Sequence, residues 1–397
     1  MNDRTFLILT SRTVSRANAF GRRPKGHHRL IETMRCVFAV ALMALVLVSG
    51  LAGSVASQGF AGLGTQSDDF AAVRPDTPLE FPRDHAAHPD YRIEWWYLTA
   101  NLRDESGAPL GIQWTLFRSA LAPGPQSPGW QNQQLWMGHA AITSQQTHRF
   151  AERLARGGVG QAGVSMGPFE AFIDNWYMRS TAGPGEDALS RLDLTASKQG
   201  DFSYRLALVA DGPLVLHGQD GFSQKAASGQ ASHYYSQPFY RVSGTVEIDG
   251  IARKVVGQAW LDREWSSQPL SEDQYGWDWM SVHFDGGSKL MAFQLRQSDG
   301  DNYTSGTWIE PDGSTRALGP GDLEFAALDH FRTEAGDVPV TWQVTLPRLG
   351  KSFTLSAINA ESFMNTLFAY WEGPAVVSGD LSGIGYLEMT GYAQNEE

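Results

Sequence analysis

The chain has 397 residues, of which 42% are hydrophobic and 19% charged, and this composition excludes an intrinsically disordered protein. Residues 1–57 hold eight Lys and Arg against two Asp and Glu, so with −12 for the whole chain the remainder carries a net charge of −18. Such an acidic body repels nucleic acid and anionic lipid surfaces, and we expect no nucleic-acid partner. A hydrophobic or neutral small molecule suits it better as a ligand.

The N-terminal segment 1–57 has the pattern of a targeting signal. Met34 and Arg35 precede an apolar run, and small residues follow through Ala56. A basic start, an apolar stretch and a small-residue cleavage site are typical of a secretory signal peptide. We therefore expect translation to begin at Met34 and the mature protein to be exported, either to the periplasm or to the medium. A single N-terminal membrane anchor is the alternative, although the run is short for a span.

Beyond the signal, the chain is predicted to consist of strands. Residues 58–79 are rich in Gly, Ser and Asp and indicate a linker, and the only cysteine, Cys36, lies within the signal. In residues 80–268, aromatic, β-branched or alternating runs predict strands at 92–102, 110–118, 134–142, 169–178, 191–196, 202–209, 240–248 and 254–261. The glycine-rich stretch 157–168 interrupts this pattern, and Asp249-Gly250 predicts a hairpin turn.

A polar connector at 266–274 indicates a domain boundary, because a chain of this length is expected to form two domains. In residues 269–397, strands are predicted at 277–284, 289–296, 303–310, 340–346, 352–358, 370–379 and 383–392. The only helix expected is a short one at 361–369. Short strands separated by turns predict an all-β protein built of sandwiches or barrels.

Residues 260–280 carry the most informative chemistry. Three carboxylates stand beside four tryptophans: Asp262, Glu264 and Asp278 beside Trp260, Trp265, Trp277 and Trp279. A carboxyl group against aromatic surface loses hydration, so its pKa rises and it can hold a proton at neutral pH. The alternative is that the tryptophans are core and the acids are solvated or paired with Arg263.

Strand alternation divides these residues between two faces. Asp262 and Glu264 are expected on one face and Arg263 and Trp265 on the other. Asp278 is likewise expected opposite Trp277 and Trp279. Not all the acids can therefore face one cavity, and Asp262 and Asp278 are the preferred proton donors. Glu94 is expected to form a structural ion pair with Arg118.

Other candidate sites are weaker. His85 and His88 near Glu94 are a poor metal chelate because no fourth ligand is evident, so no metal is expected. His233 is either a general base or a hydrogen-bonded structural histidine. The Gly-x-Ser-x-Gly match at 163–167 lacks the following helix that a nucleophile elbow needs. No dinucleotide or phosphate fingerprint occurs in a βα context, so no cofactor is expected.

Several aromatic clusters form a larger pattern, with Glu-Trp-Trp-Tyr at 94–97, Trp-Leu-Asp-Arg-Glu-Trp at 260–265 and related clusters at 81–88, 113–118, 221–225, 232–236, 276–279, 370–373 and 383–392. Together they resemble the carotenoid 1,2-hydratase family, also called hydroxyneurosporene synthase or AttH-like, whose members are often labelled secreted hydrolases. The resemblance covers nearly all of the mature chain. It implies two tandem lipocalin-like antiparallel β-barrels, at 80–268 and 269–397.

The resemblance also implies a reaction. In the hydratase branch water adds across the terminal double bond of an acyclic carotenoid, and fungal relatives act as cyclases. That branch has histidine where this chain has Arg263. Arginine cannot act as a general acid at ordinary pH, so the departure weakens the transfer of hydratase chemistry to this chain.

Two functions follow. In the first, the protein is a cofactor-free acid–base hydratase or related cyclase acting on an isoprenoid, carotenoid or lipid-like molecule. Its candidate catalytic residues are Asp262, Asp278 and Glu264, and its candidate ligand-binding residues are Trp96, Tyr235, Trp265, Trp277, Trp279 and His233. In the second, the protein carries a lipophilic molecule without turnover, with an envelope transport system as a candidate partner. The oligomeric state is not predicted.

Overall fold

The computed structural model describes residues 69–392 except Pro125, Pro269, Glu272, Asp299 and Ala335. The expected signal at 1–57 and most of the expected linker therefore lie outside the described residues. Within the described part of the chain, no helix has the length and apolarity needed to cross a membrane.

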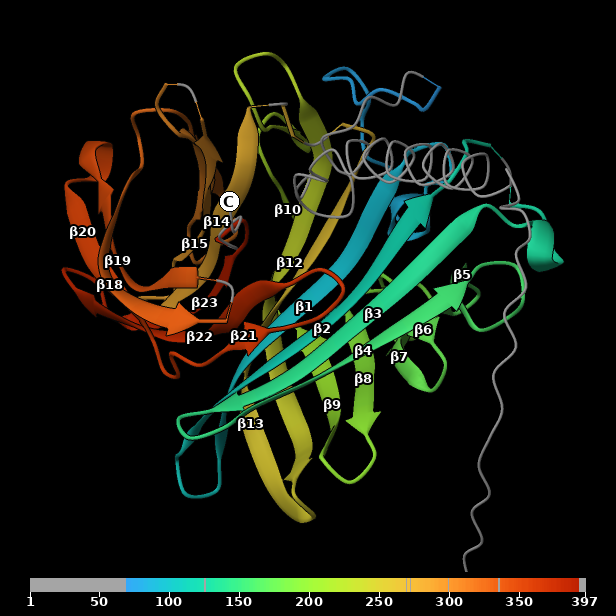
Figure 1. The fold of residues 1–397 in the computed structure, drawn as a ribbon, viewed down its shortest axis with the longest axis horizontal. Helices are drawn as coiled ribbons and strands as arrows, with labels where there is room; N and C mark the ends of the chain where they lie inside the picture. Colours follow the sequence, from blue (N-terminus) through green and yellow to red (C-terminus); the bar gives the residue numbers. More distant parts are fainter. Residues whose placement is uncertain are drawn as a thin grey trace, which may run out of the picture. The chain divides into compact units, whose positions relative to one another are not determined.

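The first sheet contains 13 antiparallel strands in the order β4-β3-β2-β1-β13-β12-β9-β8-β7-β6-β5, with β10 and β11 paired to β12. Its strands are β1 (Ile93–Asp104), β2 (Pro109–Ala120), β3 (Gln134–Ser144), β4 (His148–Arg156), β5 (Ala162–Met166), β6 (Phe169–Ile173), β7 (Trp176–Ser180), β8 (Arg191–Lys198), β9 (Phe202–Ala210), β10 (Val215–Leu216), β11 (Phe222–Gln224), β12 (Ala231–Ile248) and β13 (Ile251–Ser266). Strand β4 at one end of this order contacts β6 near the other end, so the sheet curls into a nearly closed barrel (Figure 1).

The second sheet contains 10 antiparallel strands in the order β17-β16-β15-β14-β23-β22-β20-β19-β18, with β21 paired to β22. Its strands are β14 (Gln274–Phe284), β15 (Lys289–Gln297), β16 (Tyr303–Ile309), β17 (Thr315–Leu318), β18 (Glu324–Thr333), β19 (Gly336–Leu346), β20 (Lys351–Ala357), β21 (Phe363–Met364), β22 (Tyr370–Gly379) and β23 (Gly383–Met389). The helical elements among the described residues are three short 3-10 turns at Arg83–His85, Gly129–Gln131 and Pro347–Leu349. The all-β prediction is confirmed.

The sequence explains the hairpins at which the sheets turn. Asp249 and Gly250 adopt φ angles of 51° and 80°, and this two-residue turn joins β12 to β13 with Ile248 opposite Ile251. Left-handed φ at both central positions is the turn geometry that matches the twist of paired strands. The predicted hairpin between β1 and β2 is also present, with Trp96 opposite Leu116.

Strand alternation produces three large hydrophobic cores and one small cluster of Ala141, Met364 and Tyr370 among the described residues. One fills the barrel of the first sheet, a second lies within the second sheet, and a third lies between the two sheets. Strand β14 serves two of them, because Met280 and Val282 face the core of the second sheet whereas Trp279 faces the core between the sheets. Strands β22 and β23 contact β2 and β1, respectively, and so close the third core (Figure 1).

Some predicted elements need correction. The expected helix at 361–369 is wrong: this segment holds the short strand β21 and turns. The predicted strand at 169–178 is two strands, β6 and β7, joined by a turn in which Asp174 has φ of 53°. The glycine-rich stretch at 157–168 contains β5, which pairs with β6 in a hairpin, and no helix follows it.

Candidate active site

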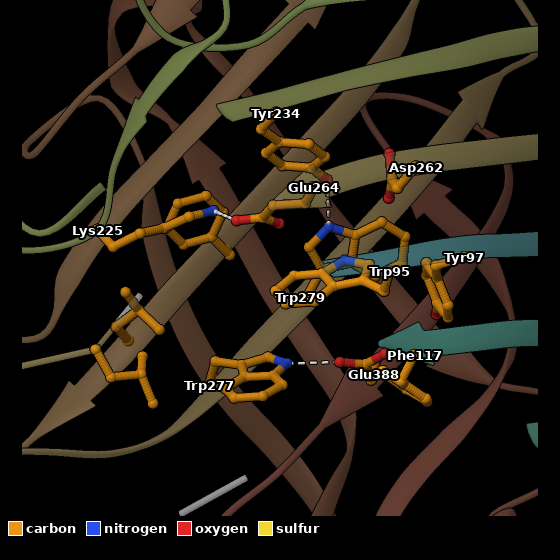
Figure 2. A pocket seen from close by; sticks show the side chains of 13 residues that line it. Trp95, Tyr97, Phe117, Lys225, Tyr234, Asp262, Glu264, Trp277, Trp279 and Glu388 are labelled. Carbon is orange, nitrogen blue, oxygen red and sulfur yellow. Dashed lines mark hydrogen bonds and ion pairs between the residues drawn. The ribbon is translucent and has the colours of Figure 1, made fainter. Parts of the chain in front are cut away.

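A pocket with a volume of about 80 Å³ lies between the two sheets (Figure 2). The first sheet and its connections contribute Trp95, Tyr97, Phe117, Lys225, Tyr234, Asp262, Glu264 and Leu270, and the second sheet contributes Trp277, Trp279, Phe293, Leu295 and Glu388. The walls are mainly aromatic and aliphatic. The side chains of Trp95, Phe117 and Trp277 are half-buried, so the pocket is partly open to solvent.

Strand alternation delivers these residues to the pocket. Asp262 and Glu264 are two positions apart on β13, so both point toward the second sheet. Trp277 and Trp279 are likewise two positions apart on β14, and both point toward the first sheet. Cross-strand register then aligns the neighbours on β1, because Trp95 lies opposite Glu264 and Tyr97 opposite Asp262.

Asp262 is a buried carboxyl group without a cationic partner among the described residues. Its Oδ1 accepts a hydrogen bond of 2.7 Å from the Trp260 indole and another from the Ser236 hydroxyl, whereas Oδ2 makes no well-formed hydrogen bond. Burial raises the pKa of Asp262 to about 7, although hydrogen bonds from Ser236, Trp260 and Tyr234 oppose this rise. Asp262 can therefore carry a proton at neutral pH.

Glu388 is the second carboxyl group of this kind. Its Oε1 accepts a hydrogen bond of 2.6 Å from the Trp277 indole. Burial raises the pKa of Glu388 to about 7, the Trp277 hydrogen bond opposes the rise, and the charge of Asp262 adds to it. Part of the Glu388 side chain is accessible because it borders the pocket. Protein forms the walls of the pocket, so the carboxyl group is still poorly hydrated. Asp262 and Glu388 are thus an interacting pair that titrates near neutral pH.

Glu264, the third acid of the pocket, is in a different state. Lys225 Nζ lies 2.8 Å from Glu264 Oε1, and both side chains are nearly buried. The same ammonium group lies 4.7 Å from the ring centroid of Tyr234 and 4.3 Å from that of Phe293. Glu264 is therefore held in an ion pair, whereas Asp262 and Glu388 have no such cationic partner among the described residues.

The other face of β13 holds a separate charged cluster inside the barrel. Arg263 Nη2 lies 2.7 Å from Glu94 Oε1, Arg118 Nε lies 2.9 Å from Glu94 Oε2, and His88 Nδ1 lies 2.6 Å from Oε1. Burial alone would raise the pKa of Glu94, but the charges of His88, Arg263 and Arg118 hold that pKa well below its usual range. The guanidinium of Arg263 also lies 3.9 Å from the Trp96 ring centroid.

Four of the residues expected to bind ligand lie on this inner face and not in the pocket. Trp96, Tyr235 and Trp265 belong to the packed core of the barrel. His233 lies beside Trp265, and its Nε2 is 3.3 Å from the Tyr91 hydroxyl. Burial lowers the pKa of His233 to about 4, so its imidazole is neutral. Of the expected walls, the structure brings Trp277 and Trp279 to the pocket.

Asp278, expected as a proton donor, is also separated from the pocket. It lies on the core side of β14, opposite Trp277 and Trp279, and is fully buried. Arg296 Nη1 lies 2.5 Å from its Oδ1, which also accepts a hydrogen bond of 2.8 Å from Tyr392. Gln294 donates to Oδ2 at 2.8 Å. An acid held by a cation and two neutral donors has no free oxygen for a ligand, so the structure indicates a structural role.

The histidines considered for a metal site have other partners. His85 Nδ1 is 2.7 Å from the Tyr235 hydroxyl and its Nε2 is 3.0 Å from Asp187. His88 bonds Glu94 and stacks on Trp265, with ring centroids 3.9 Å apart. No cluster of three or more potential metal ligands occurs in residues 69–392 outside the five positions not described.

Sequence reasoning missed several pocket residues, above all Glu388, Tyr97, Tyr234 and Lys225. A signal was present for Glu388, because it is two positions from the buried Tyr386 in the last strand and therefore shares its face, opposite Leu387. What alternation could not show was the partner, since Glu388 and Asp262 come from different sheets. The contact between β1 and β23 that brings them together has no local signature in the sequence.

Comparison with known proteins supports one family. The family model described as AttH-like matches residues 72–392. A crystal structure of an AttH-type protein from Nitrosomonas europaea is 33% identical, covers 82% of this chain and 100% of its own, and superposes with a TM-score of 0.71. Kievitone hydratase from Nectria haematococca is 15% identical, covers 82% of this chain and 95% of its own, and has a TM-score of 0.60, which shows a shared fold. No curated protein matches the sequence. The chain therefore belongs to the AttH-like family.

Proposed function

We propose that this protein is a cofactor-free acid–base hydratase that adds water to an alkene of an apolar molecule bound between its sheets. The observation that carries the proposal is the pair Asp262 and Glu388, two buried carboxyl groups with pKa values of about 7 in one aromatic pocket. General acid–base catalysis is most efficient when the catalytic pKa lies near the working pH. Hydration needs one group of each kind, an acid and a base.

Asp262 is the proposed acid. Its Oδ1 is occupied by Trp260 and Ser236, whereas Oδ2 makes no well-formed hydrogen bond and can present a proton to a ligand. The proton passes from Asp262 to one alkene carbon, and the other carbon becomes a cation. The faces of the surrounding indoles, such as those of Trp277 and Trp279, can stabilise this cation by cation–π attraction.

Glu388 is the proposed base. The indole of Trp277 donates to its Oε1, which favours the carboxylate form. Glu388 borders the pocket and can accept a proton from a water molecule as the water oxygen bonds to the carbon cation. The alcohol forms, the proton from water remains on Glu388, and Asp262 is left ionised, so charge and atoms balance.

The pocket also favours a particular ligand class. Its walls are apolar apart from the acids and Lys225, and its volume of about 80 Å³ is below that of pockets that enclose a drug-sized molecule. It therefore suits the end of an isoprenoid or lipid-like molecule whose remainder lies outside. We propose in addition that the protein is exported, on the basis of the signal pattern in residues 34–56.

Incubation with lycopene or neurosporene in water enriched in oxygen-18 tests the reaction. Mass spectrometry of the extracted pigment should reveal a tertiary alcohol carrying the heavy oxygen. Asp262→Asn and Glu388→Gln should abolish the labelled product, whereas Glu170→Gln, which removes a surface carboxylate paired with Arg179, should not. Bound pigment with no label in any product would contradict the hydratase and leave a carrier that binds without turnover.

A further inference from the structure

Polar side chains form a row across the first sheet on the face that meets the second sheet. Asp262 lies opposite Tyr97, Tyr97 opposite Thr115, Thr115 opposite His139, and His139 opposite Glu152. Residues directly opposite in antiparallel strands point to the same face, so this row runs from the pocket to β4. Glu152 ends the row with a side chain that is 24% exposed, whereas His139 is fully buried.

The second sheet adds two groups to this row. The Tyr97 hydroxyl donates to Glu372 Oε1 at 2.6 Å, and the Tyr370 hydroxyl lies 2.9 Å from His139 Nδ1. Glu372 and Tyr370 are two positions apart on β22 and share a face. The outer nitrogen of the imidazole, Nε2, lies 3.1 Å from Glu152 Oε1. Figure 2 shows Tyr97 between Asp262 and Glu388 along one side of the pocket.

Glu372 is the unusual member of the row. It is 1% exposed, its Oε2 makes no well-formed hydrogen bond, and no cation pairs with it in the described part of the chain. The titratable groups that face it are Tyr97, Tyr370, Glu388 and Tyr386, with Tyr204 more distant. An unpaired buried carboxyl group costs stability, and burial followed by the charge of Glu388 raises its pKa well above the usual range. Packing does not account for such a group.

We infer that Tyr97, Glu372, Tyr370, His139 and Glu152 form a proton path that connects the carboxyl pair of the pocket with solvent. Hydroxyl, carboxyl and neutral imidazole groups can each donate and accept, so a proton can move in steps. Neutral Glu372 gives its proton to the Tyr370 oxygen, Tyr370 gives its own to His139 Nδ1, and the proton on Nε2 passes to Glu152 and then to water. Tyr97 then gives its own hydroxyl proton to Glu372 and takes the proton of Glu388, so that Tyr97 and Glu372 are neutral again and Glu388 is ionised.

This path rests on the proposed function for its purpose, because each hydration leaves Glu388 protonated and Asp262 ionised. Before the next turnover Glu388 must lose its proton to solvent along this path, and Asp262 must regain one from solvent. The existence of the path, however, can be tested without any substrate.

Time-resolved infrared spectroscopy after a pH jump tests it directly. The C=O signal of the protonated carboxyl pair should decay at a rate at least about tenfold lower in His139→Gln and in Glu152→Gln than in the unaltered protein. The pH midpoint of the titration should be the same in all three proteins. Added imidazole should restore the rate in His139→Gln. Glu170→Gln is the matched control, because the Glu170 side chain is 25% exposed and lies outside the row.

Equal decay rates in Glu152→Gln and the unaltered protein would overturn the path, even if His139→Gln does not fold. The path would also be overturned if the decay is slower in His139→Gln, added imidazole does not restore its rate, and the rate in Glu152→Gln is unchanged. That result would indicate a packing effect of the His139 substitution. Failure of the alkene hydration test with slowed proton exchange in the variants would leave the path intact and remove only the proposed reaction.

Discussion

Two buried carboxylate clusters occupy opposite faces of strand β13, and they differ in how their charge is balanced. Inside the barrel, Glu94 is surrounded by Arg118, Arg263 and His88, all within 2.9 Å. Between the sheets, Asp262 and Glu388 have hydrogen-bond donors but no cation among the described residues. The pKa of Glu94 is therefore lowered, whereas the pKa values of Asp262 and Glu388 are raised to about 7.

Charge balance decides which of these acids can transfer protons. A balanced carboxylate keeps one charge state over the physiological range and ties elements together. An unbalanced one changes its protonation near neutral pH, which is what a proton-transferring residue needs. The same difference exists within the pocket. Lys225 forms an ion pair with Glu264, whereas Asp262 and Glu388 have no cationic partner among the described residues.

Breaking the balanced cluster should give the largest effect. Arg263→Met removes a buried ion pair with Glu94 together with hydrogen bonds to the carbonyl oxygens of Trp95 and Ala86, so the free energy of unfolding should fall by about 3–5 kcal/mol. Denaturant unfolding at neutral pH measures it. Arg241→Met removes an exposed ion pair with Asp211 and should cost less than about 1 kcal/mol. Similar losses in the two variants would mean that the barrel cluster is not the structural tie described above.

Neutralising Asp262 should change how stability depends on pH. The pKa of Asp262 is about 7 in the folded state, against 3.8 for a free carboxyl group, so the folded state binds the proton more tightly. The stability that this proton contributes is lost as the pH rises from the unfolded pKa to the folded pKa. Between about pH 4 and pH 8, the free energy of unfolding of Asp262→Asn should therefore increase by about 2–4 kcal/mol relative to that of the unaltered protein. If the free energy of unfolding depends on pH in the same way in both proteins, Asp262 is ionised across this range.

Turnover should follow a bell-shaped pH profile if the pair works as proposed. At low pH both acids are protonated and no base remains, and at high pH both are ionised and no acid remains. The maximum should lie near pH 7, the pKa value of both groups. Glu388→Gln should lower the turnover rate about a hundredfold or more while ligand binding persists. A rate that stays constant across the range would exclude the pair as the acid and base.

Removing the indole that bonds Glu388 should give the smallest effect. Trp277→Phe deletes the donor that favours the carboxylate, so the pKa of Glu388 should rise further and the low-pH limb of the profile should move to higher pH by less than about one unit. Trp308→Phe is the control, since that indole donates to Glu310 outside the pocket. A shift in the opposite direction would show that the hydrogen bond favours the neutral acid.

Local pattern predicted much of the fold and part of the site. Alternation placed Asp262 and Glu264 on one face of β13 and Arg263 and Trp265 on the other, as the structure shows. It did not show which face borders a pocket, and Trp96, Tyr235 and Trp265 were therefore placed in the site when they lie in the barrel core. Strand β18 was missed because its side chains are largely exposed and lack an alternating pattern.

The remaining features depend on contacts between distant segments. Whether a buried acid has a counter-ion is decided across strands, as for Asp278, which Arg296 of the neighbouring strand holds as an ion pair. Glu388 reaches Asp262 only because the last strand packs against the first sheet. Neither pairing can be deduced from spacing along the chain.

The central claim is that the pocket holds two carboxyl groups that change protonation near neutral pH. Infrared difference spectra recorded between about pH 5 and pH 9 measure this directly, because a protonated carboxyl group has a C=O band that its ionised form lacks. We expect a band that titrates with a midpoint of about 7 and weakens in both Asp262→Asn and Glu388→Gln. Spectra in which no carboxyl group titrates in this range, or in which the variants leave the band unchanged, would contradict it.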